Sequence, residues 1–301
     1  MTRPYVDQLR IRGFGCFTDA TLALTPIHAI VGPSDVGKTT ALRALRALSR
    51  YAQQKSVAAA MAEFAQYGRE TSVLEARVGA HGVILVRDRG GWGEHHVDDE
   101  ARGALGGHHL LRLEPDALRQ ASALIPEGAP IRFSDERGLG LSAVYDAILS
   151  RDVGTYLSLS KRLGGLFPTV KNVSLVNASA HTKSMGVLLH DGTFVSPPAV
   201  SDGLLRWLAF AALPFLATAA LVLVEEPENG LHPDGVRDVM TLLREISEKT
   251  QVVIATHSPI VVDELERNEV TVLRRDEREG TKATLLSELK LEGPDQRALG
   301  G

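Results

Sequence analysis

The sequence has few of the features that secreted or membrane-attached proteins carry. Its 301 residues include one cysteine, Cys16, so no internal disulfide can form. The first ten residues lack the apolar stretch of a secretory signal. We therefore expect a cytoplasmic protein that folds without disulfides.

A strong charge of either sign is also absent. The formal net charge is −4 at pH 7, so the field of the whole molecule does not attract nucleic acid phosphates. Any nucleic acid contact would need a local basic patch, and composition neither supports nor excludes one. A hydrophobic content of 44% is enough for the core of one large α/β domain or two modest ones.

Long apolar runs are missing as well, with one exception at residues 204–224. That run has about the length of a membrane span, but Arg206 and Pro214 interrupt it. We interpret it as a buried helix followed by a buried strand at residues 220–224, and expect no membrane segment. No heptad repeat runs through residues 51–199, which excludes a long coiled coil there.

The hydrophobic pattern predicts an α/β fold. Strands are expected near residues 6–11, 20–24, 27–31, 71–78, 82–87, 171–176, 185–189, 221–224 and 251–255. Helices are expected at 38–50, 141–149, 153–163, 203–218 and 234–248, and from Pro259 onward. Residues 88–107, rich in Gly, His and acidic residues, are predicted to be an exposed loop. The alternation after Ser201 is typical of a parallel sheet with right-handed crossovers.

A glycine-rich loop between a predicted strand and a predicted helix is the clearest motif. Residues 32–39 read GPSDVGKT and fit G-x-x-x-x-G-K-[ST]. In such a loop the backbone N–H groups surround phosphates, Lys38 reaches the β- and γ-phosphates, and the Thr39 hydroxyl binds Mg²⁺. The candidate nucleotide-binding residues of this loop are Gly32, Pro33, Ser34, Asp35, Val36, Gly37, Lys38, Thr39 and Thr40.

Two adjacent carboxylates end a later apolar strand, where LVLV at residues 221–224 runs into Glu225 and Glu226. Two acids at the end of a buried strand would be destabilising without compensation, and Mg²⁺ would supply it. We predict that Glu225 joins Thr39 as a metal ligand. Glu226, one residue later, is predicted to be the general base that polarises the attacking water.

Two further motifs complete the predicted site. The strand at residues 252–256 leads into His257, whose neutral imidazole can hydrogen-bond a γ-phosphate oxygen. Ser201, Asp202 and Gly203 open a helix, where a hydroxyl and free N–H groups can form a second anion site. Because the chain has one glycine-rich loop of this kind, that second site needs another molecule's phosphate. Taken alone, S-D-G also fits a plain helix N-cap. The predicted catalytic residues are Lys38, Glu226 and His257.

These motifs resemble those of ABC-type P-loop ATPases of the RecF, SMC and OLD kind, and most closely the stand-alone predicted AAA-family ATPases that share their core. The matching segments are 9–14 with Phe17, the P-loop, VSDG at 200–203, VEEPENGLHP at 224–233 and ATHSP at 255–259. The resemblance covers about the first fifty and the last hundred residues firmly, and 139–168 looks like the helical lid of that group.

The resemblance implies a single ABC-type ATPase domain over residues 1–301. Its nucleotide-binding core would be 1–50 and 200–270, with a parallel central sheet and an N-terminal antiparallel β subdomain. Residues 51–199 would be an inserted β-meander and helical lid region.

The resemblance also implies a head-to-tail homodimer, or a higher homo-oligomer, with two Mg–ATP between the protomers. Each ATP would contact the P-loop of one chain and the signature residues Ser201 and Gly203 of the other. Glu228 and Asn229 would belong to the D-loop at that interface, and His257 would be the switch histidine. Binding would favour the closed dimer and hydrolysis would release it.

Three features depart from the family pattern. Glu225 stands where an aspartate is usual, and no glutamine is placed firmly as the Q-loop, Gln66 being the candidate. About forty residues follow His257, too few for the Toprim nuclease of OLD proteins. We therefore expect any nuclease to be a separate chain.

For function, the resemblance implies an ATPase that clamps or senses nucleic acid, or controls a separate effector such as a nuclease or toxin, in phage defence or DNA repair. One alternative is the ATP-binding subunit of a membrane transporter; another is an assembly scaffold that binds ATP but turns it over slowly. Transporter signatures usually read L-S-G-G-Q, whereas residues 200–204 read VSDGL, which favours the first interpretation.

Several other residues are given structural interpretations. Four histidines lack the spaced partners of a zinc site and are expected to be exposed loop residues: His95, His96, His108 and His109. Three arginines fit a solvated helix face as well as a phosphate-binding one: Arg43, Arg46 and Arg50. Trp207 is predicted to lie in the core.

Overall fold

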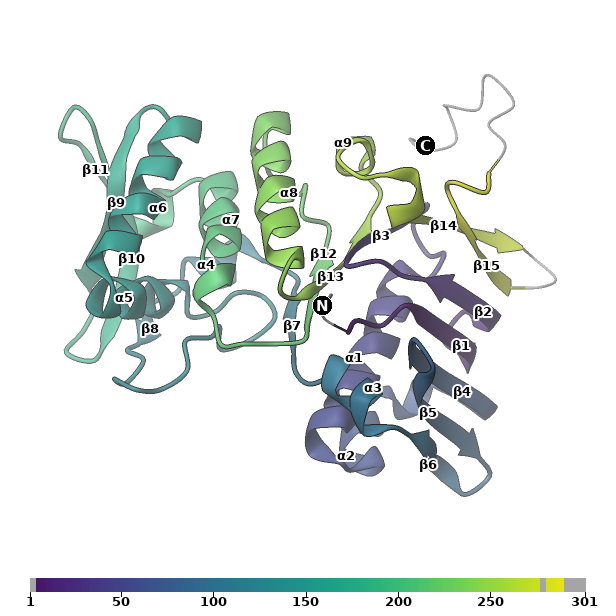
Figure 1. Ribbon diagram of the computed structural model, residues 1–301. Helices are drawn as coiled ribbons and strands as arrows, with labels where there is room; N and C mark the ends of the chain where they lie inside the picture. Colours follow the sequence, from purple (N-terminus) through teal and green to yellow (C-terminus); the bar gives the residue numbers. More distant parts are fainter. Residues whose placement is uncertain (1–3, 277–279, 290–301) are drawn as a thin grey trace. The chain divides into compact units, whose positions relative to one another are not determined.

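The computed structural model describes residues 4–276 and 280–289, apart from the side chains of residues 65 and 66 (Figure 1). Its contacts divide the chain into two compact units. Of the described residues, unit 1 comprises 4–110, 219–227, 243–276 and 280–289, and unit 2 comprises 111–218 and 228–242. Of the helices in the described ranges, none has both the length and the apolar character that a bilayer span requires.

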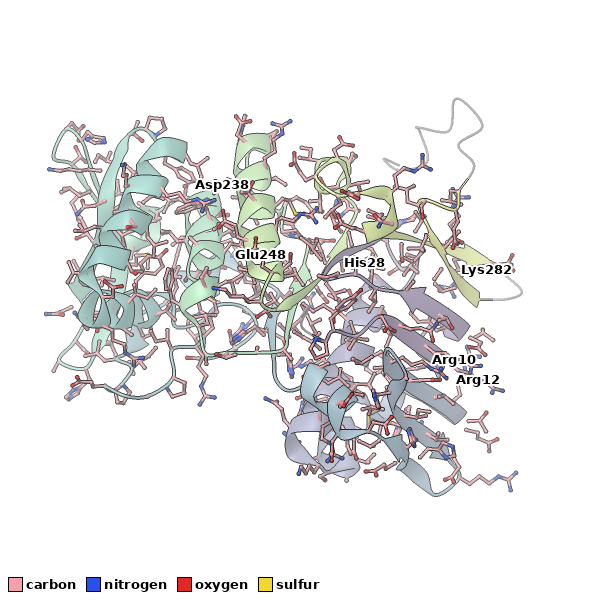
Figure 2. All side chains as sticks on the ribbon, viewed as in Figure 1. Arg10, Arg12, His28, Asp238, Glu248 and Lys282 are labelled. Carbon is pink, nitrogen blue, oxygen red and sulfur yellow. The ribbon has the colours of Figure 1, made fainter. Side chains whose placement is uncertain are left out.

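Unit 1 contains a five-stranded antiparallel sheet in the order β2-β1-β4-β5-β6. Its strands are β1 (Gln8–Phe14), β2 (Phe17–Ala23), β4 (Gly68–Val78), β5 (His81–Asp88) and β6 (Gly91–Val97). Alternating burial along β1 and β2 shows that one face of the sheet packs on the core. The predicted strands in β1, β2, β4 and β5 are confirmed. Arg10 and Arg12, on the other face of β1, point away from that core (Figure 2).

The prediction of an exposed loop at residues 88–107 is wrong, because this segment forms strand β6 and helix α3 (Asp99–Ala104). Strand β6 is an edge strand whose residues are all exposed or half-buried, so it lacks the apolar alternation that identifies a strand in sequence. Backbone pairing with β5 holds it, together with the half-buried side chains of Trp92 and Val97, which pack against the core. Helix α3 buries only two alanines, Ala101 and Ala104.

The second sheet of unit 1 has the order β15-β14-β3-β13-β12-β7. Its strands are β3 (Ile27–Val31), β7 (His108–Leu111), β12 (Leu221–Glu225), β13 (Gln251–Thr256), β14 (Val270–Asp276) and β15 (Gly280–Leu285). Strands β14, β3, β13 and β12 are parallel, and β15 is antiparallel to β14. Every residue of β3 and β13 is buried, including the polar His28, Gln251 and Thr256, as expected for central strands of a parallel sheet.

Helix α1 (Lys38–Gln54) packs between these two sheets, against β12 and β13 on one side and β1 and β4 on the other. Its alanine and leucine side chains at three- and four-residue spacing lie in the main apolar core of the unit. Smaller elements complete unit 1: α2 (Val57–Met61), η1 (Ala62–Tyr67), α9 (Pro259–Asp263) and η4 (Arg267–Glu269). Helix α8 (Pro233–Ser247) begins in unit 2 and ends in unit 1.

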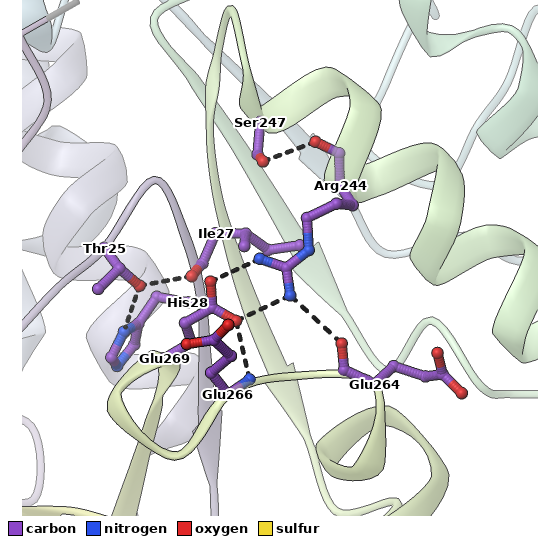
Figure 3. Close-up of polar contacts among 8 residues, drawn as sticks. All are labelled: Thr25, Ile27, His28, Arg244, Ser247, Glu264, Glu266 and Glu269. Atoms are coloured by element: carbon purple, nitrogen blue, oxygen red, sulfur yellow. Dashed lines mark hydrogen bonds and ion pairs between the residues drawn. The ribbon is translucent and has the colours of Figure 1, made fainter. Parts of the chain in front are cut away.

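The strand that leads to the P-loop is held by buried polar contacts. On β3, His28 is fully buried, and its Nε2 lies 2.8 Å from the Thr271 hydroxyl of β14. Its Nδ1 lies 3.1 Å from the Thr25 hydroxyl (Figure 3). Nearby, Arg244 donates to the Glu269 carboxylate at 2.8 Å and so joins α8 to η4. These contacts fix the parallel sheet on the side of β14.

Unit 2 contains a small antiparallel sheet covered by two helices. Strands β9 (Val170–Asn177) and β10 (Thr182–Leu189) pair along their length, and the short β8 (Ser122–Ala123) and β11 (Phe194–Val195) also pair with β10. Helices α5 (Leu141–Arg151) and α6 (Val153–Leu166) pack on this sheet. Both helices and the β9–β10 pair agree with the predicted elements.

The rest of unit 2 is α4 (Pro115–Leu118), η2 (Pro197–Ala199), α7 (Asp202–Ala211), η3 (Leu213–Phe215) and the start of α8. The helix predicted at 203–218 ends early, because Pro214 cannot continue an α-helix and lies in η3. Trp207 is fully buried, which confirms the prediction, and its Nε1 donates to Asp238 at 2.7 Å. Asp238 also accepts from Arg162 at 3.0 Å and so joins α8 to α6 and α7 (Figure 2).

Candidate functional site

Three adjacent parallel strands end at the same level in unit 1. Strand β13 lies between β3 and β12, with Thr256 paired to Val31 and Ala255 paired to Glu225. The next residues along the three strands are Gly32, His257 and Glu226. The sheet register therefore brings the start of the P-loop, the predicted switch histidine and the predicted base to one edge, where ligands of open parallel sheets bind.

The P-loop has a backbone that requires glycine at two positions. Gly37 has φ +109° and is the N-cap of α1; a Cβ there would meet the Cys16 sulfur and the Phe17 ring. Gly32 has φ +155°, and a Cβ there would meet the Leu273 carbonyl oxygen. The loop is therefore packed closely from outside and leaves its inner side to backbone N–H groups.

Lys38 is the first residue of α1, and its side chain folds back over the loop. Its Nζ donates to the carbonyl oxygens of Gly32 at 2.7 Å and Pro33 at 2.8 Å. An ammonium held by two carbonyls of the loop carries its positive charge where an anion would bind. Together with the N-terminus of α1, this arrangement suits a phosphate group.

Two residues that the sequence reasoning missed support the loop from outside. The Thr281 hydroxyl of β15 is 1% exposed and donates to the Val36 carbonyl at 2.8 Å. The Cys16 thiol, in the turn after β1, also donates to this carbonyl at 3.6 Å. In a trans peptide the carbonyl and the following N–H point in opposite directions, so these contacts direct the Gly37 N–H the other way.

Glu226 and His257 contact each other beyond the strand ends. The His257 Nδ1 lies 3.3 Å from the Glu226 Oε1, and the two side chains are 57% and 41% exposed. The Glu226 N–H donates to the Ala255 carbonyl at 2.8 Å, which ties the backbone after β12 to β13. A carboxylate and an imidazole are thus held side by side, accessible to solvent and next to the P-loop strand.

Backbone strain marks the same region. Three non-glycine residues have a left-handed backbone in the part of the chain that the structure describes: Asp35, Lys55 and Glu226. Asp35 lies in the P-loop with φ +65°, and Glu226 follows β12 with φ +47°. Non-glycine residues in this conformation are strained and concentrate at functional sites, which supports a role for this edge of the sheet.

The donors available for a magnesium ion are oxygens. Thr39 lies in the first turn of α1 and Glu225 is the last residue of β12, both half-buried. The described residues contain no group of three or more His, Cys, Asp and Glu side chains that could hold a metal alone. A hydroxyl and one carboxylate fit Mg²⁺ bound with nucleotide phosphates, because Mg²⁺ keeps waters and phosphate oxygens among its ligands.

The predicted signature and D-loop residues lie in unit 2. Ser201 is the N-cap of α7, is exposed, and makes no side-chain capping bond, so its hydroxyl is available. A Cβ on Gly203 would meet the Gly230 carbonyl oxygen, so the start of α7 packs directly on the D-loop. Glu228 and Asn229, just before Gly230, are half-buried. The Gln66 side chain, the candidate Q-loop residue, lies outside the described residues.

Two of the structural interpretations made from sequence need correction. The three arginines of α1 are partly buried and bound: Arg46 and Arg50 pair with Glu63 at 3.6 and 2.5 Å, and Arg43 donates to the Tyr67 hydroxyl at 2.8 Å. They are neither a solvated face nor a phosphate surface, because η1 covers that side of the helix.

The other correction concerns the histidine pairs. His108 and His109 are half-buried in β7, and Ser49 lies 3.0 Å from the His108 Nδ1. Burial lowers the pKa of His108 to about 4. His95 and His96 are exposed as expected, but in β6 and not in a loop.

Comparison with protein families identifies related sequences over most of the chain. Residues 103–263 match the model described as AAA domain, putative AbiEii toxin, Type IV TA system. Residues 5–62 match a second AAA domain model. None of the curated proteins matches the sequence.

Solved structures of SMC head domains are similar to the chain. An SMC head bound to the C-terminal winged-helix domain of ScpA matches with TM-score 0.63 and 15% identity, covering 96% of this chain and 98% of that one. The SMC head from Thermotoga maritima matches with TM-score 0.52 and 14% identity over 93% and 98%. An SMC head bound to the C-terminal domain of ScpA derived from Pyrococcus furiosus matches with TM-score 0.61 and 12% identity, covering 95% of this chain and 97% of that one. The fold is therefore that of an ABC-type P-loop ATPase head, as the motifs predicted.

Proposed function

We propose that this chain binds Mg–ATP and hydrolyses it to ADP and phosphate. The premise is that the chain belongs to the family described as AAA domain, putative AbiEii toxin, Type IV TA system, whose model matches more than half of its length. The observation that carries the proposal is the contact between Glu226 and His257 beside the P-loop strand. A basic carboxylate, a histidine and a phosphate cradle at one sheet edge are the parts that γ-phosphate hydrolysis needs.

In the proposed reaction, Lys38 moves from the Gly32 and Pro33 carbonyls to the β- and γ-phosphates and stabilises their charge. Glu226 accepts a proton from water while the water oxygen bonds to the γ-phosphorus and the bond to the β-phosphate oxygen breaks. His257 hydrogen-bonds the γ-phosphate and holds the Glu226 carboxylate. A bound Mg²⁺, held by Thr39 and Glu225, would neutralise phosphate charge.

We further propose that ATP is shared between two copies of the chain. The exposed Ser201 hydroxyl and the N-terminus of α7, with Gly203, would bind the γ-phosphate held by the partner's P-loop. The D-loop residues Glu228 and Asn229 would lie at that interface, since Gly230 packs against Gly203. ATP then holds a head-to-tail homodimer closed, and hydrolysis opens it.

In the cell, we propose that this dimer is a nucleotide-gated clamp or sensor in the cytoplasm that controls a separate effector, such as a nuclease or toxin, or acts on nucleic acid. The family description names a putative toxin and a type IV TA system, which supports a connection with a toxin effector. We propose phage defence as the setting of that effector. The two SMC heads bound to ScpA support a protein partner for a head of this fold. A role in DNA repair would use the same clamp on nucleic acid.

Phosphate release from Mg–ATP tests the enzymatic part. We expect release from the wild type and a loss of about 100-fold or more in Glu226→Gln, because general-base catalysis contributes about 10²–10⁴-fold. Glu248→Gln, at an exposed position just after α8, is the matched control and should behave as wild type (Figure 2). ATP binding without release from the wild type would contradict hydrolysis and favour a low-turnover assembly scaffold.

A further inference from the structure

The proposed signature of this chain carries an acid at the point where a phosphate would bind. Asp202 is the first residue of α7 and follows Ser201 directly. A carboxylate in the first turn of a helix is attracted to the free N–H groups there, as a phosphate is. Asp202 therefore opposes an incoming γ-phosphate in two ways, by repulsion and by competing for the same N–H groups.

Arg119 meets this carboxylate from the end of helix α4. Its guanidinium donates to the Asp202 carboxylate and, at 2.9 Å, to the carbonyl oxygen of Val200. Val200 is 2% exposed, so the second bond anchors Arg119 to a fixed part of the backbone. Arg119 therefore binds the residue before Ser201 and the residue after it, and so holds the backbone of residues 200–202.

The contact is independent of the Ser201 hydroxyl. Ser201 is exposed and makes no side-chain cap bond, and α7 begins with the Ser201 backbone extended, at φ −64° and ψ 147°. Arg119 thus occupies the Asp202 carboxylate, while Ser201 presents its own side chain to solvent. Packing of α4 on α7 keeps the arginine in place.

We infer that Arg119 is a positioning residue for the shared ATP site: it neutralises Asp202 and holds its carboxylate away from the N-terminus of α7, so that this end of the helix can accept the partner's γ-phosphate. The inference rests on the proposed ATP dimer. Arg119 acts through Asp202 and the backbone of residues 200–202, and its effect is on dimer formation and not on ATP binding by the P-loop of the same chain.

The test uses the full chain with Glu226→Gln, which should retain ATP if Glu226 is the general base. Sedimentation in Mg–ATP gives the dimer dissociation constant, and titration with a fluorescent ATP analogue at low protein concentration gives the affinity of the monomer for nucleotide. The variants in this background are Arg119→Ala, Asp202→Asn and the two combined. Arg137→Ala is the matched control, because Arg137 is a similarly ion-paired arginine of unit 2, bound to Asp135 at 3.1 Å.

We expect Arg119→Ala to weaken the dimer about 100-fold, which corresponds to tenfold at each of two sites. Its affinity for the ATP analogue should stay within about twofold, and Arg137→Ala should dimerise as the parent does. Adding Asp202→Asn to Arg119→Ala should restore most of the dimer affinity, because the carboxylate at the start of α7 is then gone; the second carboxylate that Arg119 contacts, Asp116 at 3.5 Å, belongs to α4. A purely structural role for Arg119 would not show this rescue.

Four results would overturn the inference. In the first, Arg119→Ala dimerises as tightly as the parent. In the second, Arg119→Ala weakens the dimer, and adding Asp202→Asn does not restore the dimer affinity. If Arg119→Ala does not fold, the dimer affinity of Asp202→Asn alone tests the inference. This variant should form a tighter dimer than the parent at low salt, and a weaker dimer would be the third contradicting result. A parent that stays monomeric in Mg–ATP would instead refute the proposed dimer itself, and the inference with it.

Discussion

Protonation of His28 should destabilise the fold in mildly acidic solution. His28 is fully buried on β3, and one ring nitrogen contacts the Thr25 hydroxyl (Figure 3). The other ring nitrogen contacts the Thr271 hydroxyl. Burial disfavours its charged form and lowers its pKa to about 4. In the unfolded chain the pKa returns to about 6.5. Between these values the unfolded state binds a proton that the folded state does not.

The sign and size of the effect follow from this difference. Stability is full above pH 6.5 and falls as the pH is lowered towards 4, because proton binding favours the unfolded state. At pH 5, proton binding to His28 in the unfolded state lowers the unfolding free energy by ~2 kcal/mol, since each unit of pKa difference corresponds to about 1.4 kcal/mol. That is a large share of the stability of a typical domain.

Urea unfolding at pH 7.5 and pH 5.0 measures this loss of unfolding free energy, and the variant His28→Asn is the comparison. We expect the wild type to lose about 2 kcal/mol more than the variant between the two pH values. His108 also has a pKa of about 4, but it is present in both proteins and cancels in the difference. An equal loss in wild type and variant would refute the reasoning.

Three further predictions concern unit 1. Gly37→Ala should abolish binding of a fluorescent ATP analogue, because Gly37 has φ +109° and its surroundings leave no room for a Cβ; unchanged affinity would contradict the P-loop assignment. Thr281→Val should lower ATP affinity about tenfold by freeing the Val36 carbonyl, while Thr281→Ser keeps it, and equal affinities in both variants would exclude this support. Gln251→Leu should lower the unfolding free energy by about 2 kcal/mol, because the Val6 N–H and carbonyl lose their partner; no shift in the urea midpoint would count against it.

The parallel sheet and the P-loop were predictable from sequence because local patterns define them. Apolar runs such as residues 252–255 identify buried strands, and the motif at 32–39 requires its own loop geometry. The meeting of Glu226 and His257 was also predictable, because parallel strands end at a common edge. The roles assigned to these residues stay predictions until nucleotide binding is measured.

The supporting residues were not predictable, because they act over long sequence separations. Thr281 is 245 residues from Val36, and Arg119 is 83 residues from Asp202. A lone threonine on a strand or a lone arginine at a helix end carries no local signal of such a contact. Edge strand β6 was missed for a different reason: its side chains do not alternate between buried and exposed, so its sequence lacks the pattern that identifies a strand.

The mass of Glu226→Gln in Mg–ATP, measured by light scattering after size exclusion, tests the shared-site account most directly. The account predicts twice the monomer mass with ATP, the monomer mass without it, and the monomer mass with ATP once Ser201→Arg is added. A mass that is the same in all three measurements would contradict the account.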